Sequence, residues 1–421
     1  MEVRPGYKQT EVGAIPEKWE VKPLGKLSEF VTSGSRGWAK HYSDTGPVFV
    51  RSQNIRDGRL DFTDQQCVTP PAGSEGNRTR LNRHDLLITI TGNSVGNVAW
   101  VERDLREAYI SQHIGLVRLS EPSLAEYVCL FLSPGSPGNR QIWASQTGQS
   151  KPGLNLKNLQ DFWVALPSPP ERCAIATTLR DVDALLDTLG RLIAKKRDLQ
   201  QGAMQELLTG AKRLAGFDGD WNVKQLGGVA SFHKGRGLAK SDLDPFGLEP
   251  CIHYGELFTK YPASIRDVIG RTNNQAGVFR SVANDVLMPT SDVTPNGLGT
   301  ASCILQNDVI LGGDILVIRS DRNLVDGSFL SYVIRLLRAQ VMQLVTGTTV
   351  YHLYGTDLKQ FTFSMPSIEE QNAIVRIIDD MAEDVAALEE ESAKVRQLKQ
   401  GLMHELLTGK TRLVSHEASH A

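Results

Sequence analysis

Residues 166–214 read LPSPPERCAIATTLRDVDALLDTLGRLIAKKRDLQQGAMQELLTGAKRL, and residues 365–413 read MPSIEEQNAIVRIIDDMAEDVAALEEESAKVRQLKQGLMHELLTGKTRL. An offset of 199 residues aligns these two stretches without a gap. A period of this length is far greater than the roughly 20–50 residues of solenoid repeats. The sequence therefore predicts two copies of one large module, and two copies suggest two similar sites.

Both stretches are predicted to be long amphipathic helices. From about residue 170 to residue 208, leucine, isoleucine and valine recur at steps of three and four residues, the spacing of an apolar helical stripe. The second copy has the same spacing from Ile374 to Leu402. Neither stretch contains an internal proline beyond its first turn, and each closes with LLTG, in which glycine predicts the helix stop.

A helix with an apolar stripe needs a partner that buries the stripe. One alternative is that each helix packs only on its own domain, and the favoured one is that the two helices pair as an antiparallel coiled coil. Residues 166–214 carry 8 Lys and Arg against 6 Asp and Glu, whereas residues 365–421 carry 6 against 11. In an antiparallel pair Lys195-Lys196-Arg197 would face Glu389-Glu390-Glu391, and such opposite charges select partner and orientation.

Outside the helices the sequence predicts short strands separated by clusters of Gly, Asn, Asp and Pro. The strand-like runs are PVFV (47–50), DLLITI (85–90), HIGLVRL (113–119), DVLM (285–288), SCIL (302–305) and DILVI (314–318). The predicted fold is therefore α+β, with two globular domains separated by two long helices that form an antiparallel intramolecular coiled coil with pseudo-twofold symmetry. The predicted segments are domain 1 (1–165), the first spacer helix (166–214), domain 2 (215–364), the second spacer helix (365–413) and a disordered tail (414–421).

The two domains match at a few anchors and diverge between them. Trp19 corresponds to Trp221, and GSRGWAK (34–40) corresponds to GRGLAK (235–240). A shared scaffold with a divergent interior is what two recognition domains for different targets would show.

Composition excludes several classes of protein. Apolar residues make up 40% and charged residues 22% of the chain, as in ordinary globular proteins, and the net charge is −2. No apolar run approaches the roughly 18 residues that cross a bilayer, and the first residues predict no secretory signal. Five scattered cysteines without a CxxC motif predict a reducing, cytoplasmic location and neither disulfides nor a zinc site.

The motifs of catalysis are absent or out of place. HEASH (416–420) matches a zinc-protease pattern but lies in a polar tail, where nothing buries it. The phosphate-binding loop of NTPases is missing. The string closest to the Asn/Asp-Pro-Pro-aromatic signature of amino methyltransferases is Asp244-Pro245-Phe246, which lacks one proline. We expect a chain without catalytic residues or a metal site.

Polar residues in the predicted loops favour DNA binding, with solvated loops as the alternative. Arg, Gln and Asn form bidentate hydrogen bonds with base edges, and Lys and Arg contact phosphates. Such residues occur in Arg51–Arg59 and Asn77–His84 of domain 1, and in several stretches of domain 2. The candidate DNA contacts are Arg36, Lys40, Arg51, Gln53, Asn54, Arg78, Arg80, Lys151, Lys234, Arg236, Lys240, His253, Tyr254, Arg271, Asn273, Tyr351 and His352.

The repeated helix motif makes the chain similar to a known family. Pro167–Ile175 and Pro366–Ile374, each followed by a helix that ends in ELLTG-x-x-RL, resemble the specificity subunit of type I restriction-modification systems. Cys251–Glu256 also resembles part of a target recognition domain of that family. The chain departs from the usual motif at Arg172, where the second copy has the common Gln371.

The resemblance implies a non-catalytic DNA-binding subunit. Residues 1–165 and 215–364 would each read one half of a bipartite duplex target, and the helices would set the spacer and dock two modification (methyltransferase) subunits. S-adenosylmethionine would bind to those subunits, and ATP and Mg to restriction (endonuclease) subunits, with no cofactor in this chain. A coiled-coil scaffold with two ligand-binding domains and no DNA role is the alternative, while the missing motifs disfavour a self-sufficient methyltransferase.

Overall fold

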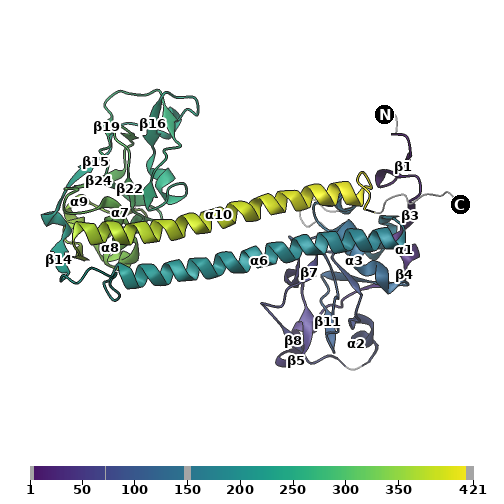
Figure 1. The fold of residues 1–421 in the computed structure, drawn as a ribbon. Helices are drawn as coiled ribbons and strands as arrows, with labels where there is room; N and C mark the ends of the chain where they lie inside the picture. Colours follow the sequence, from purple (N-terminus) through teal and green to yellow (C-terminus); the bar gives the residue numbers. More distant parts are fainter. Residues whose placement is uncertain (1–3, 72, 147–152, 414–421) are drawn as a thin grey trace. The chain divides into compact units, whose positions relative to one another are not determined.

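The computed structural model describes residues 4–71, 73–146 and 153–413. It divides into two compact units: unit 1 comprises Met1–Leu189 and Glu391–Ala421, and unit 2 comprises Gly190–Glu390 (Figure 1). Each unit thus holds one mixed domain, the start of the helix that follows this domain, and the end of the other helix. Lys151, the HEASH string and the predicted tail lie outside the described residues.

The main sheet of unit 1 has four antiparallel strands in the order β10-β9-β12-β4. The strands are β4 (Ser28–Ser33), β9 (Leu86–Thr89), β10 (Val98–Trp100) and β12 (Ile114–Leu119). Two of them confirm the predicted runs DLLITI and HIGLVRL. Every residue of β9 is buried, which explains why this run is apolar throughout and does not alternate.

A second, smaller sheet of unit 1 has the order β11-β5-β8. Its strands are β5 (Tyr42–Val50), which contains the predicted run PVFV, β8 (Cys67–Val68) and β11 (Ala108–Ile110). β5 and β11 run parallel. An aromatic cluster supports this sheet: the Trp38 ring stacks on Phe49 at 5.3 Å between centroids and contacts Tyr109. We call this sheet and its cluster the outer sheet of unit 1.

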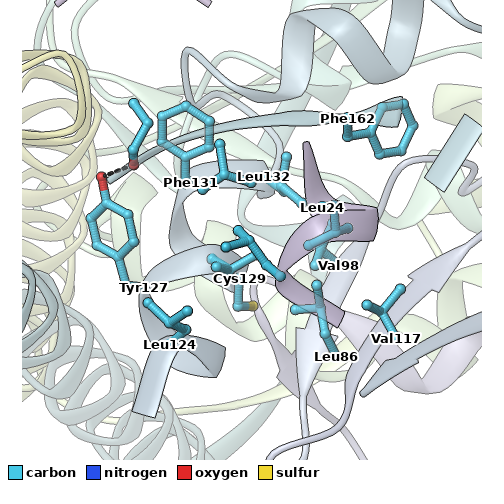
Figure 2. Packing of buried hydrophobic residues seen from close by; sticks show 14 of the residues in the cluster. Leu24, Leu86, Val98, Val117, Leu124, Tyr127, Cys129, Phe131, Leu132 and Phe162 are labelled. Carbon is cyan, nitrogen blue, oxygen red and sulfur yellow. Dashed lines mark hydrogen bonds between the residues drawn. The ribbon is translucent and has the colours of Figure 1, made fainter. Parts of the chain in front are cut away.

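The core of unit 1 gathers side chains from stretches far apart in the sequence (Figure 2). Helix α3 (Ala125–Leu132) contributes Tyr127, whose hydroxyl donates a 2.9 Å hydrogen bond to the carbonyl oxygen of Ala165. Leu406 and Leu407, near the end of the second repeat, belong to the same buried cluster. The core of unit 1 is therefore completed by residues from the other end of the chain.

Unit 2 repeats this architecture although its sequence differs. Its main sheet has the order β15-β24-β20-β22-β17. The first four strands in this order correspond to β4, β12, β9 and β10 of unit 1. The strands are β15 (Ala230–Lys234), β17 (Ser264–Ile265), β20 (Asp285–Pro289), β22 (Ser302–Ile304) and β24 (Ile315–Ser320), which confirms the runs DVLM, SCIL and DILVI. The two divergent interiors therefore share one scaffold.

The outer sheet of unit 2 has the order β18-β16-β23-β19. Its strands are β16 (Glu249–Ile252), β18 (Arg271–Thr272), β19 (Phe279–Arg280) and β23 (Ile310–Leu311). β16 and β23 run parallel, as β5 and β11 do in unit 1.

A two-stranded ribbon closes each domain beside its helix. In unit 1, β3 (Glu20–Pro23) pairs with β13 (Trp163–Leu166), and in unit 2, β14 (Asn222–Gln225) pairs with β26 (Thr362–Met365). The remaining elements of unit 1 are β1 (Tyr7–Thr10), β2 (Gly13–Pro16), α1 (Leu24–Leu27), η1 (Trp38–His41), η2 (Ser52–Asn54), β6 (Ile55–Arg56), β7 (Arg59–Leu60), α2 (Ser74–Thr79), η3 (Pro122–Leu124), α4 (Asn139–Ala144) and α5 (Leu156–Asp161). Those of unit 2 are η4 (Leu226–Gly228), η5 (Lys240–Asp242), η6 (Tyr254–Phe258), β21 (Ser291–Asp292), η7 (Pro295–Gly299), α7 (Gly327–Leu336), α8 (Arg338–Leu344), β25 (Tyr351–His352) and α9 (Gly355–Leu358).

The two long helices are α6 (Pro169–Leu207) and α10 (Ile368–Leu407), and they run antiparallel (Figure 1). In unit 1 Lys399 forms a 2.6 Å ion pair with Asp183. In unit 2 Arg197 pairs with Glu389 at 2.5 Å, as predicted, whereas Lys196 pairs with Asp384 instead of the glutamate run. The predicted helix pairing is confirmed.

The start of each helix also packs on its own domain. Ile175 and Leu179 of α6 belong to the core of unit 1, and Ile374 and Ile378 of α10 belong to the core of unit 2. Each helix is therefore buried in both of the ways that the sequence allows. Its start packs on its own domain, and other parts of it pair with the other long helix. Among the described residues, every helix is too short or too polar to span a lipid bilayer.

Candidate nucleic-acid interface

A buried glutamate at the first turn of each long helix holds each unit together. In unit 1 both carboxylate oxygens of Glu171 accept hydrogen bonds from Arg412, and one also accepts from Trp19 Nε1 at 3.1 Å. Glu171 is fully buried, and its hydrogen bonds raise the pKa of the Arg412 guanidinium. Arg412 lies three residues after Gly409, whose φ of +69° ends α10 as the sequence predicts.

Unit 2 contains the same contact. Arg213 donates two 2.7 Å hydrogen bonds to Glu370, and Trp221 Nε1 donates a third at 3.1 Å. The arginine of the repeated ELLTG-x-x-RL motif therefore joins the end of one long helix to the start of the other long helix. We call each Trp–Glu–Arg set a closing triad.

The structure accounts for the presence of Arg172 at the position where the second copy of the motif has Gln371. Gln371 is fully buried, accepts a hydrogen bond from the backbone N–H of Asp326 at 2.9 Å and donates to the carbonyl of Leu324. Arg172 instead pairs with Glu121 at 3.0 Å. Both side chains hold the helix start to the loop before α3 or α7, so the change preserves the contact.

A second shared feature is a buried aspartate–arginine pair that the sequence comparison missed. Asp85, immediately before β9, accepts two 2.8 Å hydrogen bonds from Arg118 of β12. In unit 2 Asp285 accepts two of 2.7 Å from Arg319. Burial raises the pKa of Asp85, while its hydrogen bond raises that of Arg118. The aspartates are 200 residues apart and the arginines 201, so a fixed 199-residue offset does not align them.

The matched GSRGWAK and GRGLAK stretches form equivalent loops between the two sheets of each unit. A Cβ atom on Gly34 would lie 2.2 Å from the Ser111 carbonyl oxygen, and one on Gly235 would lie 2.1 Å from that of Gly312. Only glycine allows this close approach of two backbones. The hydrophobic residues of these loops, Trp38 and Leu238, are buried.

The candidate cations of these loops occupy matching places. Arg36 and Lys40 of unit 1, and Arg236 and Lys240 of unit 2, are all exposed. None of these four forms an ion pair within the part of the chain that the structure describes. Each unit therefore presents two cations beside its outer sheet, the arrangement expected of phosphate contacts.

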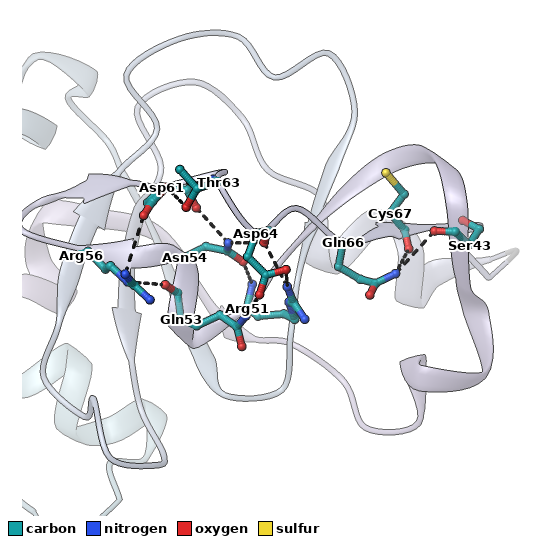
Figure 3. A network of polar contacts seen from close by, with 10 residues as sticks. All are labelled: Ser43, Arg51, Gln53, Asn54, Arg56, Asp61, Thr63, Asp64, Gln66 and Cys67. Carbon is teal, nitrogen blue, oxygen red and sulfur yellow. Dashed lines mark hydrogen bonds and ion pairs between the residues drawn. The ribbon is translucent and has the colours of Figure 1, made fainter. Parts of the chain in front are cut away.

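In unit 1 three further candidates lie in the loop after β5 (Figure 3). Arg51 pairs with Asp64 at 3.0 Å, and the exposed Gln53 donates to the same carboxylate. Both side chains thus lie near the surface. To contact a DNA phosphate or base edge, each would first have to leave the Asp64 carboxylate.

The candidate Asn54 lies inside the fold and not at its surface. Asn54 is 2% exposed, and its amide nitrogen donates to the carbonyl oxygens of Asp61 and Asp64 at 2.8 and 3.0 Å. Its Oδ1 accepts from the backbone N–H of Arg51 at 2.9 Å. A buried amide with these partners holds the loop and is not available to read a base edge.

The loop after β16 in unit 2 has the same organisation with other side chains. Glu256, which is 6% exposed, accepts from the backbone N–H of His253 at 3.0 Å, as Asn54 does from Arg51. The rings of His253 and Tyr254 contact each other at 4.7 Å between centroids. His253 and Tyr254 therefore stand where unit 1 has Arg51 and the residue after it.

The other candidates of unit 1 surround α2. The Arg78 guanidinium donates to the carbonyl oxygen of Ser33 at 2.6 Å and to the hydroxyls of Thr32 and Ser35, so much of its donor capacity is used within the fold. Arg80 is exposed, with a single long contact of 3.5 Å to the Arg106 carbonyl oxygen. Arg80 is thus the more available of the two.

The remaining candidates of unit 2 form two groups. Lys234 and His352 line a cavity of about 590 Å³, in which Lys234 pairs with Asp314 at 3.3 Å and the His352 ring stacks on Tyr354. Tyr351, half-buried, precedes His352 in β25. The exposed Arg271 and Asn273 lie at the end of the outer sheet, away from the strands of the cavity.

A protein-family model and known relatives match this architecture. Residues 218–397 match the model of the type I restriction modification DNA specificity domain. The MjaX specificity subunit of Methanocaldococcus jannaschii, a type I restriction enzyme subunit, is 24% identical over 97% of this chain and 97% of its own length. The MjaVIII specificity subunit of the same organism is 20% identical over 97% of this chain and 96% of its own length.

Solved structures show that the fold is shared. The type I restriction-modification S subunit of M. genitalium superposes with a TM-score of 0.60 and 13% identity, covering 96% of this chain and 98% of that one. A chain from a structural study of complex assembly and conformational transition of the type I R-M system gives a TM-score of 0.55 and 19% identity, covering 94% and 99%.

Proposed function

We propose that this chain is a type I restriction-modification specificity subunit, the sequence-specific DNA-binding subunit of such a complex, and its similarity to the family model and to the named relatives supports this. Domain 1 and domain 2 each read one half of a bipartite duplex target. The relatives are named specificity subunits, and we assign this chain the same non-catalytic role.

The observation that carries this proposal is one scaffold with two different sets of exposed or half-buried loop side chains. The sheet order, the buried Asp–Arg pair and the exposed cations beside the outer sheet recur in both units. The side chains of the loop after the first outer-sheet strand do not recur: unit 1 has Arg51 and Gln53 in this loop, whereas unit 2 has His253 and Tyr254. Shared cations suit phosphates, which are the same in any sequence, and variable side chains suit bases.

The long helices supply the spacer and the docking sites. Two weakly binding domains on one chain bind a split target with much greater avidity than either does alone. The two modification subunits dock on the helical segments that the repeat preserves, and they bring S-adenosylmethionine. The restriction subunits bring ATP and Mg, and this chain itself binds no cofactor.

Paired deletion of one heptad from each helix should change the spacer of the target or prevent assembly. An unchanged spacer with full binding would contradict a spacer role.

Duplex binding by the purified full-length chain, alone and with modification subunits, tests the proposal. We expect sequence-specific binding by the complex that weakens steeply with salt, since phosphate contacts release counterions. An Arg36→Ala/Lys40→Ala double variant should weaken binding to all sequences alike. A complex that assembles without any affinity for DNA would contradict the proposal and favour a scaffold that binds other ligands.

A further inference from the structure

A rigid turn at the outer sheet of unit 2 presents two apolar side chains to solvent. Phe246 is 91% exposed and Leu248 is 83% exposed, in a turn just before β16. Burial of such side chains against a partner is favourable, and this fold leaves that contribution unused. Neighbouring exposed apolar side chains of this kind mark a contact surface more often than single ones do.

The turn is held in place before any partner arrives. The Asp244 carboxylate accepts from the backbone N–H of Phe246 at 2.9 Å and from Asn273 Nδ2 at 2.8 Å. Asn273 Oδ1 in turn accepts from the backbone N–H of Leu248 at 3.1 Å. A Cβ atom on Gly247 would lie 2.5 Å from the backbone nitrogen of Thr272, so the turn lies directly on β18.

Two exposed cations lie near the turn, beside the half-buried carboxylates of Asp242 and Asp244. The backbone N–H of Asp244 donates to the carbonyl oxygen of Arg271, whose side chain is exposed. Lys240, also exposed, lies four residues before Asp244 in the sequence. Neither cation forms an ion pair within the described residues, whereas both oxygens of the Asp244 carboxylate are engaged by N–H groups. An exposed apolar tip with cations near it that form no ion pair within the described residues suits a duplex, which offers phosphates on the outside and stacked bases within.

From this arrangement we infer that Phe246 is a wedge that inserts against a base step of the half-site bound by domain 2, with Leu248 beside it. Side chains such as Phe and Leu unstack a step and kink the duplex when neighbouring cations hold the phosphates. The inference rests on the proposed function and deepens it, because it adds a contact that reads the ease of deforming the step.

The inference assigns the wedge to one half-site only. The β5–β11 and β16–β23 pairings make Asp44 and Gly46 of unit 1 the equivalents of Phe246 and Leu248. Neither residue carries an aromatic or aliphatic side chain. Deformation of the duplex should therefore be asymmetric, at the half-site of domain 2.

Fluorescence of 2-aminopurine, which rises when the base is unstacked, tests the wedge. The probe is a duplex that carries the methylated sequence mapped for the wild-type complex, with 2-aminopurine placed at successive positions of both half-sites. The wild-type complex should raise the fluorescence at one step of the domain 2 half-site. Phe246→Ala should abolish that rise and weaken binding about ten-fold, and Phe246→Trp should retain both properties.

Two further variants separate the possible failures. Val223→Ala, at a 73% exposed valine of β14, is the matched control and should behave as wild type. Lys240→Ala/Arg271→Ala should weaken binding through lost phosphate contacts.

If Phe246→Ala binds and unstacks DNA as wild type does, the wedge is wrong although DNA binding stands. If Phe246→Ala loses modification subunits but not DNA, the turn is a protein contact and the inference fails. A wild-type complex that does not bind DNA overturns the proposed function itself.

Discussion

The closing triads and the loops after β5 and β16 occupy equivalent places in the two units, yet only the triads are the same. Trp19–Glu171–Arg412 and Trp221–Glu370–Arg213 agree in every hydrogen bond. The loops agree only in the buried residue that organises them, Asn54 or Glu256. The triads, which are the same, are organised around a buried glutamate and hold the fold together, whereas the loop side chains that differ lie at or near the surface. We expect changes in the first class to act on stability and changes in the second to act on specificity.

The largest effect should follow removal of the arginine from a closing triad. Arg412→Ala leaves the buried Glu171 carboxylate without its cation, which we expect to cost about 3–5 kcal/mol of unfolding free energy. Arg213→Ala is the matched change in unit 2. Urea denaturation followed by domain-specific tryptophan fluorescence would measure both, and a large loss in one unit with none in the other would break the equivalence.

The buried Asp–Arg pairs should matter nearly as much, and in a pH-dependent way. Arg118→Ala should cost about 3 kcal/mol at neutral pH, because Asp85 stays buried without its partner. The pKa of Asp85 already lies above its ordinary value through burial and would rise further. A raised carboxyl pKa in the folded state stabilises the protonated form, so stability is lost as pH rises through that pKa and recovers on acidification. Denaturation of Arg118→Ala at neutral and mildly acidic pH measures this recovery, and an equal deficit at both would contradict the role of Asp85.

A moderate effect should follow an added methyl group where two backbones meet. Gly34→Ala and Gly235→Ala should each cost about 2 kcal/mol, because the new Cβ atom would overlap a carbonyl oxygen. Gly190→Ala, at a helical glycine with open space around it, is the control and should not destabilise the chain. Thermal denaturation distinguishes them, and tolerance of both loop variants would show that the close approach relaxes freely.

The smallest loss of stability should follow substitution of Asn54, the buried residue that holds the loop containing Arg51. Asn54→Ala should cost about 1–2 kcal/mol through its lost hydrogen bonds. Gln53→Ala, one residue away, should leave stability unchanged but relax the sequence read by domain 1, by about ten-fold at one position. Denaturation together with mapping of methylated sites checks both, and the reverse pattern would restore Asn54 as a base reader.

The sequence predicted the helices well because their apolar spacing continues for about ten turns, and it predicted the strand runs because most are apolar throughout. It did not reveal that the end of each helix joins the other unit, since this depends on how Arg412 meets Glu171 across 241 residues. The Asp85–Arg118 pair was missed because single-residue insertions shift its copy. The sequence could not show that Asn54 is buried, because residue type does not distinguish a buried amide from an exposed one. It also could not show that Phe246 stands on a rigid turn.

Methylated-site mapping of a domain chimera tests the central claim most directly. Residues 1–165 would be replaced by the corresponding domain of a relative, and DNA from cells that express the chimera with its modification subunits would be sequenced for methylated adenine. The account predicts a new sequence in one half of the target, with the other half and the spacer unchanged. A change in both halves, or in neither, would contradict it.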